Sequence, residues 1–263
     1  MPLLLWILLF TVIGGALSAL AASLFLLAPE RLRARVLPHL VSFATGALLG
    51  AALLGLLPHA IEGAGGENTH AIGLTLLAGL LLFFVLEKLV LWRHCHQEMC
   101  EGHLPPSHAH DHARDVASAR LVLIGDGFHN VLDGVLIAAA FMIDVHLGVV
   151  TALAVFAHEI PQEVGDLAIL LHGGMSRARA LTLNLLTSLT SVIGGLLAYL
   201  AFGQIERLLP YAIVIAAASF LYIAVADLIP GLHRRVDPGS GVRQFVFIVL
   251  GVVVIYVSHR MAH

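Results

Sequence analysis

Long apolar stretches dominate the pattern of hydrophobic and polar positions along this chain of 263 residues. A membrane-spanning helix needs roughly 20 predominantly apolar residues, and eight stretches approach or exceed that length. Short polar segments separate them, except for one long polar connection at 94–117. We therefore predict eight transmembrane helices, over residues 3–27, 38–61, 70–93, 118–141, 146–172, 178–203, 208–231 and 241–260.

The composition is also that of a protein embedded in a membrane. Hydrophobic residues make up 59% of it and charged residues 12%, and the mean hydropathy is +0.94. Soluble domains carry about 25% charged residues, so this chain has too little polar surface to dissolve its fold in water. We expect an all-α polytopic membrane protein that forms a single membrane domain over residues 1–263.

Basic residues predict the orientation of the helices. If eight helices alternate in direction, twelve of the fourteen Lys and Arg residues fall on one side of the membrane. Cytoplasmic loops carry this excess, so both termini should lie outside the cytoplasm and the connection 94–117 inside it. The net charge of −3 excludes a broadly basic chain that binds nucleic acid.

The connection 94–117 is rich in histidine and holds both cysteines of the chain. Cysteines in a cytoplasmic loop are expected to be reduced, so we predict no disulfide. Such tracts often bind metal, but they also serve as plain polar linkers, and both interpretations stay open. The residues concerned are His94, Cys95, His96, Cys100, His103, His108, His110 and His112.

A polar stripe interrupts the fourth predicted helix. Asp126, His129, Asn130 and Asp133 follow the spacing i, i+3, i+4, i+7, which places all four on one helical face. The other faces carry mostly Leu, Ile, Val, Phe and Ala. The stripe therefore faces the interior of the bundle rather than lipid.

A second stripe lies on the fifth predicted helix. His158, Gln162 and Asp166 lie within 80° of one another at 100° per residue, and Glu159 and Glu163 occupy the adjoining flank. A charge at the bilayer centre costs at least about 2.5–3.5 kcal/mol, so these groups need a partner that offsets the cost. A divalent cation is such a partner.

Two pairs at i, i+4 spacing are suited to metal ligation. His129 with Asp133, and His158 with Gln162, can each aim two ligands at one point. Imidazole nitrogen with carboxylate oxygen, and no thiolate, suits Zn²⁺ and also Fe²⁺ or Mn²⁺. Asn130, Glu159 and Glu163 offer a neighbouring oxygen-rich position or a shell around the first one. A hydrogen-bond network that merely joins the two helices, or a metal-free proton relay, are the alternatives.

These residues resemble the ZIP family of divalent-metal transporters, in the branch with the signature H-E-x-P-H-E-x-G-D. The matching segments are Gly125–Gly134 in the fourth helix, His158–Asp166 in the fifth, Leu57–Ala60 in the second, Glu87-Lys88 in the third, and Leu221–Ala224 with Asp227–Pro230 in the seventh. The resemblance implies an eight-helix fold, usually a homodimer, that moves zinc or related cations into the cytoplasm. It also implies that the protein is a transporter and not an enzyme.

By matching positions, the resemblance assigns His129, Asp133, His158 and Gln162 to the main transport site. Asn130 and Glu159, with Gln162 again, would form the neighbouring site. Position 162 departs from the family pattern, since it carries a neutral amide where the signature has a second histidine. We expect weaker binding or a different ion preference, with one main metal position and a weak neighbour.

An intramembrane zinc metalloprotease is the alternative function, because His158-Glu159 begins like H-E-x-x-H. That motif needs histidine at i+4 as a zinc ligand, and the residue there is Gln162. The expected cargo is zinc, with Fe, Mn or Cd as other candidates, and no resident cofactor is expected. The short extramembrane parts suggest the plasma membrane of a prokaryote.

Alternating access of the site to the two sides is the expected mechanism. Asp126 and Asp166 lie about two helical turns from the site centre and are candidates for the lining of the two half-channels. His59 and Asp227 lie near Pro58 and Pro230, at the ends of the second and seventh helices. The similar Leu-Leu-Pro and Leu-Ile-Pro elements there suggest an inverted repeat, as in many transporters.

Overall fold

The computed structural model of the chain describes residues 2–64, 68–95, 108–172, 174–202, 208–233 and 238–260. Every regular element in these ranges is helical. The α-helices are α1 (Leu3–Val12), α2 (Ser18–Leu26), α3 (Glu30–Gly50), α4 (Leu57–Gly63), α5 (Thr69–Cys95), α6 (His108–Ile143), α7 (Val145–His172), α8 (Arg177–Ser188), α9 (Thr190–Phe202), α10 (Leu209–Tyr222), α11 (Ile229–His233) and α12 (Pro238–Arg260). Three π-helical segments, η1 (Ile13–Leu17), η2 (Ala51–Leu56) and η4 (Ile223–Leu228), continue α1, α3 and α10.

Seven stretches of the described chain are long and apolar enough to cross a membrane. They are Leu3–Leu26, Glu30–Gly63, Thr69–Leu86, Leu123–Ile143, Arg177–Ala201, Leu209–His233 and Gly239–Ser258. Helix α7 is also long, with 28 residues, but its middle carries His158, Glu159 and Glu163. The all-helical membrane fold is thus confirmed, whereas the count of eight spans stays a prediction.

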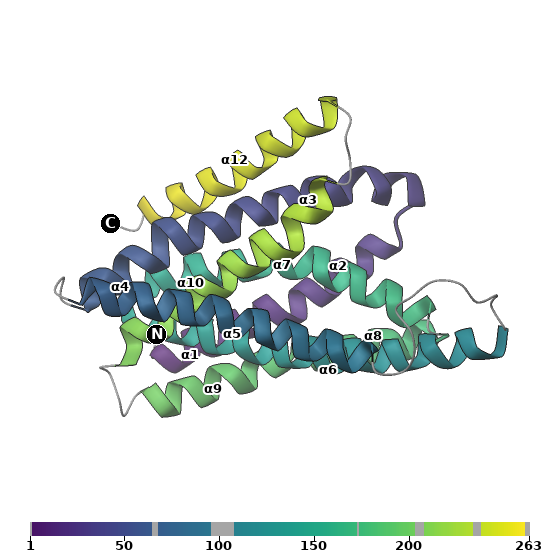
Figure 1. Cartoon of the computed structure of the whole chain (residues 1–263), viewed down its shortest axis with the longest axis horizontal. Helices are drawn as coiled ribbons and strands as arrows, with labels where there is room; N and C mark the ends of the chain where they lie inside the picture. The colour runs from purple at the N-terminus through teal and green to yellow at the C-terminus, as the bar shows by residue number, and fades with distance from the viewer. Residues whose placement is uncertain are drawn as a thin grey trace.

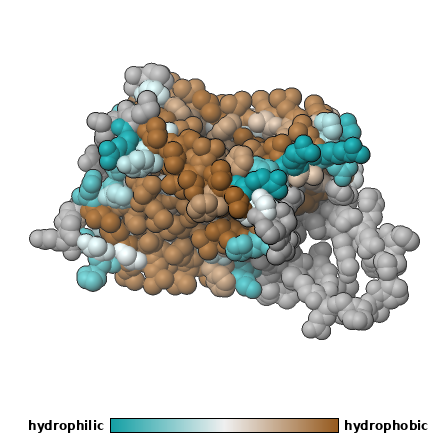
Figure 2. Space-filling view, turned by 90° about the horizontal axis from the view of Figure 1, so that it is seen from above, coloured by the Kyte–Doolittle hydropathy of each residue, from teal (hydrophilic) through white to brown (hydrophobic). Residues whose placement is uncertain are grey.

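The long helices lie side by side as one bundle, and both ends of the described chain lie at the same end of it (Figure 1). An even number of crossings requires this placement of the termini. On the face of the molecule that bears α12, apolar surface covers the middle and hydrophilic residues gather at both ends (Figure 2). This distribution is the one expected of a bundle that spans a bilayer.

Helices α6 and α7 occupy the centre of the bundle. Helix α6 packs along α9, α7 and α1, and α7 also contacts α2 and α3. At the turn between the two, the Asp144 carboxylate accepts hydrogen bonds from the backbone N–H groups of His146 and Leu147, at 2.8 and 3.0 Å. These bonds satisfy free N–H groups at the start of α7. The two polar stripes therefore lie on central helices, away from lipid.

The second and seventh spans share an unusual local structure. Segment η2 ends two residues before Pro58, and η4 ends two residues before Pro230. Proline cannot donate to the carbonyl one turn before it, and a π-turn redistributes the hydrogen bonds around such a gap. The matching pair supports the suggested repeat, as does the packing of α3 along α12 and of α5 along α10.

The long connection is shorter than the hydropathy pattern predicts. Helix α5 continues to Cys95 and α6 begins at His108, so residues 108–117 of the predicted loop are helical. Hydropathy marks where a helix leaves the membrane, but a helix can continue into the polar region beyond it. Residues 96–107 lie outside the described part of the chain.

Glycines bring α6 and α9 into close contact. A Cβ atom added to Gly134 of α6 would overlap the backbone carbonyl of Ser191, and one added to Gly194 of α9 would overlap that of Val131. Small residues allow this close approach of helix backbones in membrane proteins. The contact holds the stripe of α6 at a fixed depth and rotation.

This packing makes a stability prediction. Gly134→Ala should lower the thermal midpoint of unfolding in detergent, because overpacking against backbone costs about 1–3 kcal/mol. Gly73→Ala in α5 is the matched control, since its Cβ meets nothing within 4 Å. Equal midpoints for wild type and Gly134→Ala would contradict the close contact.

Candidate metal centre

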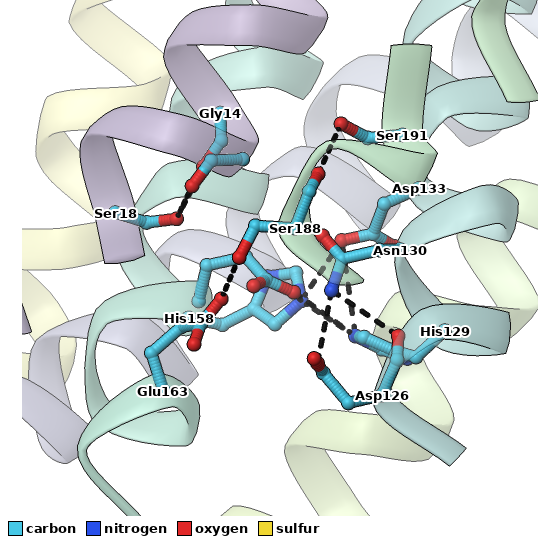
Figure 3. A network of polar contacts seen from close by, with 12 residues as sticks. Gly14, Ser18, Asp126, His129, Asn130, Asp133, His158, Glu163, Ser188 and Ser191 are labelled. Carbon is cyan, nitrogen blue, oxygen red and sulfur yellow. Dashed lines mark hydrogen bonds and ion pairs between the residues drawn. The ribbon is translucent and has the colours of Figure 1, made fainter. Parts of the chain in front are cut away.

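The polar stripes of α6 and α7 face each other in the middle of the bundle (Figure 3). Helix α6 supplies Asp133, which is 1% exposed, and α7 supplies His158 and Glu159, at 1% and 0%. His129 is the most accessible member, with a side chain 21% exposed. The predicted inward orientation of both stripes is confirmed for these residues.

Four side-chain atoms from these residues converge on one point. The two imidazole Nε2 atoms, of His129 and His158, lie 3.2 Å apart. Asp133 Oδ2 lies 3.3 Å from Nε2 of His158 and 3.8 Å from that of His129. Glu159 Oε1 lies 3.4 Å from Nε2 of His129 and 3.7 Å from that of His158. All four atoms lie within 4.8 Å of one another.

These separations are close to the edges of a zinc tetrahedron. Zinc ligands at 2.0–2.1 Å in tetrahedral geometry are about 3.3 Å from each other. The five separations given above span 3.2 to 3.8 Å. The donor set therefore fits a single Zn²⁺ with little movement of the side chains.

The tautomer of His158 is fixed by the backbone of its own helix. Its Nδ1 lies 3.1 Å from the carbonyl oxygen of Ala154. A carbonyl only accepts hydrogen bonds, so Nδ1 carries the proton and a neutral ring turns the lone pair of Nε2 toward the centre. Metal-binding histidines are oriented in this way by a bond to their second nitrogen.

The carboxylates at the centre lack hydrogen-bond donors. Both oxygens of Asp133 and both oxygens of Glu159 are buried and have no hydrogen-bond partner among the described residues. A buried polar group without a partner costs about 1–3 kcal/mol, and a charged one costs more. Four such oxygens beside two imidazoles create a site whose electrostatics favour a cation.

A second group of carboxylates adjoins the first and shares Glu159 with it. Carboxylate oxygens of Asp126, Glu159 and Glu163 lie within 4.8 Å of one another, and all three residues are buried. The amide nitrogen of Asn130 donates to Asp126 Oδ1 at 2.9 Å, while Asp126 Oδ2 has no hydrogen-bond partner in the described chain. This group is rich in oxygen and contains no imidazole.

Glu163 differs from Glu159 because it is anchored by α8. Ser188 Oγ donates to Glu163 Oε1 at 2.5 Å, and the amide nitrogen of Asn184 donates to Glu163 Oε2. Asn184 is 1% exposed and was not predicted as a site residue. The available signal was its position one turn before Ser188, with leucines at 183 and 185 on either side.

Gln162, Asp166 and His59 are more accessible than the carboxylates of the centre. Gln162 and Asp166 are half-buried on α7, and the metal role of Gln162 stays a prediction. His59 is half-buried in α4, where its Nδ1 lies 2.9 Å from the carbonyl oxygen of Gly55. The side chain of Asp227 is not among those that the structure describes.

The zinc-protease alternative is not supported. In H-E-x-x-H the glutamate acts as general base next to the metal rather than as a ligand. Here Glu159 Oε1 is one of the four converging atoms, and the residue at the second histidine position is Gln162. His129 and Asp133 come from a different helix from the motif.

Comparison with known proteins agrees with this geometry. The model of the ZIP zinc transporter family matches residues 3–118 and 93–259. The zinc transporter ZIP13 of Pongo abelii is 31% identical over 230 residues, which cover 83% of this chain and 65% of that protein. The human zinc transporters ZIP5 and ZIP4 are 34% and 31% identical, over 84% and 77% of this chain and 51% and 40% of their own lengths.

The chain thus spans between about two fifths and two thirds of the length of these relatives. The family match nevertheless extends from the first described helix to the last, and it includes both helices of the candidate centre. The chain belongs to the ZIP zinc transporter family.

Proposed function

We propose that this protein moves divalent metal cations, zinc foremost, across the membrane into the cytoplasm, through the centre between α6 and α7. The observation that carries the proposal is the convergence of two imidazole nitrogens and two carboxylate oxygens within 4.8 Å, deep in a membrane bundle. The relatives named above are zinc transporters. Their names support zinc as the cargo.

The main metal position consists of His129, Asp133, His158 and Glu159. Two neutral imidazoles and two carboxylates give the site two negative charges, which balance one Zn²⁺. Glu159 takes the place that matching to the family assigns to Gln162, because its Oε1 reaches both imidazoles. Gln162 lies one turn after His158 and adds a neutral amide oxygen, which favours zinc less strongly than a third imidazole would.

A neighbouring cation position lies at Asp126, Glu159 and Glu163, with Asn130 beside it. Its donors are oxygens, so it suits a hard or partly hydrated ion better than a tightly held zinc. Glu159 belongs to both groups and offers a path between them. A cation passes from one position to the other without leaving carboxylate contact.

Transport follows from alternating exposure of this centre. A cation enters from outside, exchanges water for the ligands and leaves toward the side with most of the basic residues. Asp126 and Asp166 line the half-channels, and His59 and Asp227 lie along the route. The protein works as a homodimer in a plasma membrane, in a prokaryote, with both termini outside and eight spans. Fe, Mn and Cd are further candidate cargoes.

Transport should depend on His129. In proteoliposomes loaded with no metal, His129→Ala should lower initial radioactive zinc uptake at least about tenfold, because second-shell losses alone cost 10–100-fold in metal affinity. His70→Ala is the matched control, since His70 is exposed on α5. Equal uptake by His129→Ala and wild type would overturn the proposed function.

The two candidate fourth ligands should differ in their effect on zinc binding. Glu159→Gln should raise the Kd for zinc, measured by calorimetry, at least about tenfold, because a charged ligand of the main position is lost. Gln162→Ala should change it by less than about threefold. A larger change in Kd for Gln162→Ala than for Glu159→Gln would assign Gln162 to the main position and Glu159 to the neighbouring one.

A further inference from the structure

A groove opens between α3 and α12 on the outer surface of the bundle. It has a volume of about 490 Å³ and is lined by Arg35, Val36, His39, Leu40, Phe43 and Phe247. All but Arg35 and His39 are apolar. The His39 ring meets the Phe247 ring edge-on, with centroids 4.7 Å apart, and its Nδ1 lies 2.7 Å from the carbonyl oxygen of Arg35.

The groove exists because α3 and α12 diverge toward their N-terminal ends. Farther along, glycines draw the helices together: a Cβ on Gly46 would overlap the carbonyl of Ile248, and one on Gly251 would overlap that of Phe43. Nearer the start of α12, a Cβ on Gly241 would meet nothing within 4 Å, and α12 moves away from α3 (Figure 1). The side chains of α3 then form the floor of an open groove on the outer surface of the bundle.

The charge of the lining residues changes along this groove with their distance from the start of α3. Helix α3 begins at Glu30, so Arg35 lies about 7.5 Å from its start and Phe43 about 12 Å deeper, at 1.5 Å per residue. The span Glu30–Gly63 has 34 residues, which is longer than the roughly 30 Å of a bilayer core requires. Arg35 therefore lies nearer the end of this span than Leu40 and Phe43 do, so a bilayer around the span would place Arg35 closer to the headgroups.

The positive charge at this end is not neutralised within the described chain. Arg31 and Arg35 are exposed, one turn apart on the same face. No ion pair of either residue is found in the part of the chain that the structure describes. Glu30 is the one acidic residue in the first turn of α3.

We propose that this groove binds an anionic phospholipid. One acyl chain lies along Val36, Leu40, Phe43 and Phe247, and the phosphate group accepts hydrogen bonds from the Arg35 guanidinium, with Arg31 one turn above it. Arginine binds phosphate oxygens with two parallel N–H donors, so it holds the headgroup in one orientation. A groove that is apolar below and cationic above matches the two parts of such a lipid.

The test is native mass spectrometry of the full chain in detergent, with phosphatidylglycerol or phosphatidylcholine of identical acyl chains. One basic residue near the surface contributes about 1 kcal/mol toward an anionic lipid, so wild type should retain phosphatidylglycerol about fivefold more than phosphatidylcholine. Arg35→Gln should remove this preference. Arg179→Gln, an exposed arginine near the start of α8, should leave it unchanged.

A second variant tests the apolar part of the site. Leu40→Trp should fill the groove and lower the retention of both lipids. If that variant does not fold, the comparison of Arg35→Gln with Arg179→Gln decides alone. Equal retention of the two lipids by wild type, or equal loss in the two arginine variants, overturns the proposal. So does a lipid-free dimer that Leu40→Trp converts to monomers, because the groove then belongs to a second copy of the chain.

Discussion

Buried carboxylate oxygens without a hydrogen bond, in the middle of an apolar bundle, are the constraint on which this structure depends. Asp133 and Glu159 are almost fully buried, and their four oxygens find no hydrogen-bond donor among the described residues. Ionised, such groups are expensive in a low-dielectric interior unless a positive charge lies beside them. A divalent cation held with two imidazoles removes that cost, and its departure restores it. Departure of the ion from a centre of this kind therefore favours a change of conformation that relieves this cost.

The surrounding fold serves to keep this centre compact. Helices α6 and α7 are central, and glycines hold α6 against α9 with no side chain between their backbones. Two glutamates one turn apart on α7 have different roles in the structure. Glu163 is bound by Ser188 and Asn184 of α8 and so ties the helices together. Glu159 has no such donors and points to both imidazoles. The same residue type serves as an anchor in one place and offers a converging carboxylate oxygen, suited to a metal ion, in the next.

Much of this arrangement is predictable from the sequence, because a membrane simplifies the inference. The spacing of His129 and Asp133, and the composition of the flanking residues, suffice to predict an inward-facing stripe on a spanning helix. The choice between Glu159 and Gln162 is not predictable in this way. The two residues lie on adjoining flanks of α7, and which flank meets α6 depends on the rotation that tertiary packing sets. Asn184 escapes notice for the same reason, since its partner Glu163 comes from a different helix.

Among local backbone features, some are likewise predictable from the sequence and others are not. Pro58 and Pro230 mark two equivalent interruptions in the sequence, whereas the π-helical form of η2 and η4 emerges only from the hydrogen bonding of the folded helices. Hydropathy also places the start of the fourth span at 118, ten residues after α6 begins. The apolar pattern predicts which residues cross the bilayer, but it does not predict how far a helix continues beyond the apolar stretch.

Zinc K-edge X-ray absorption on the protein loaded with one equivalent of zinc tests the central claim most directly. The account predicts about four nitrogen or oxygen ligands at 2.0–2.1 Å, with the outer-shell scattering of two imidazoles and no sulfur. A zinc–sulfur distance of about 2.3 Å would place the ion on Cys95 or Cys100 instead. That result, or scattering from fewer than two imidazoles, would contradict the assignment of the centre to His129 and His158.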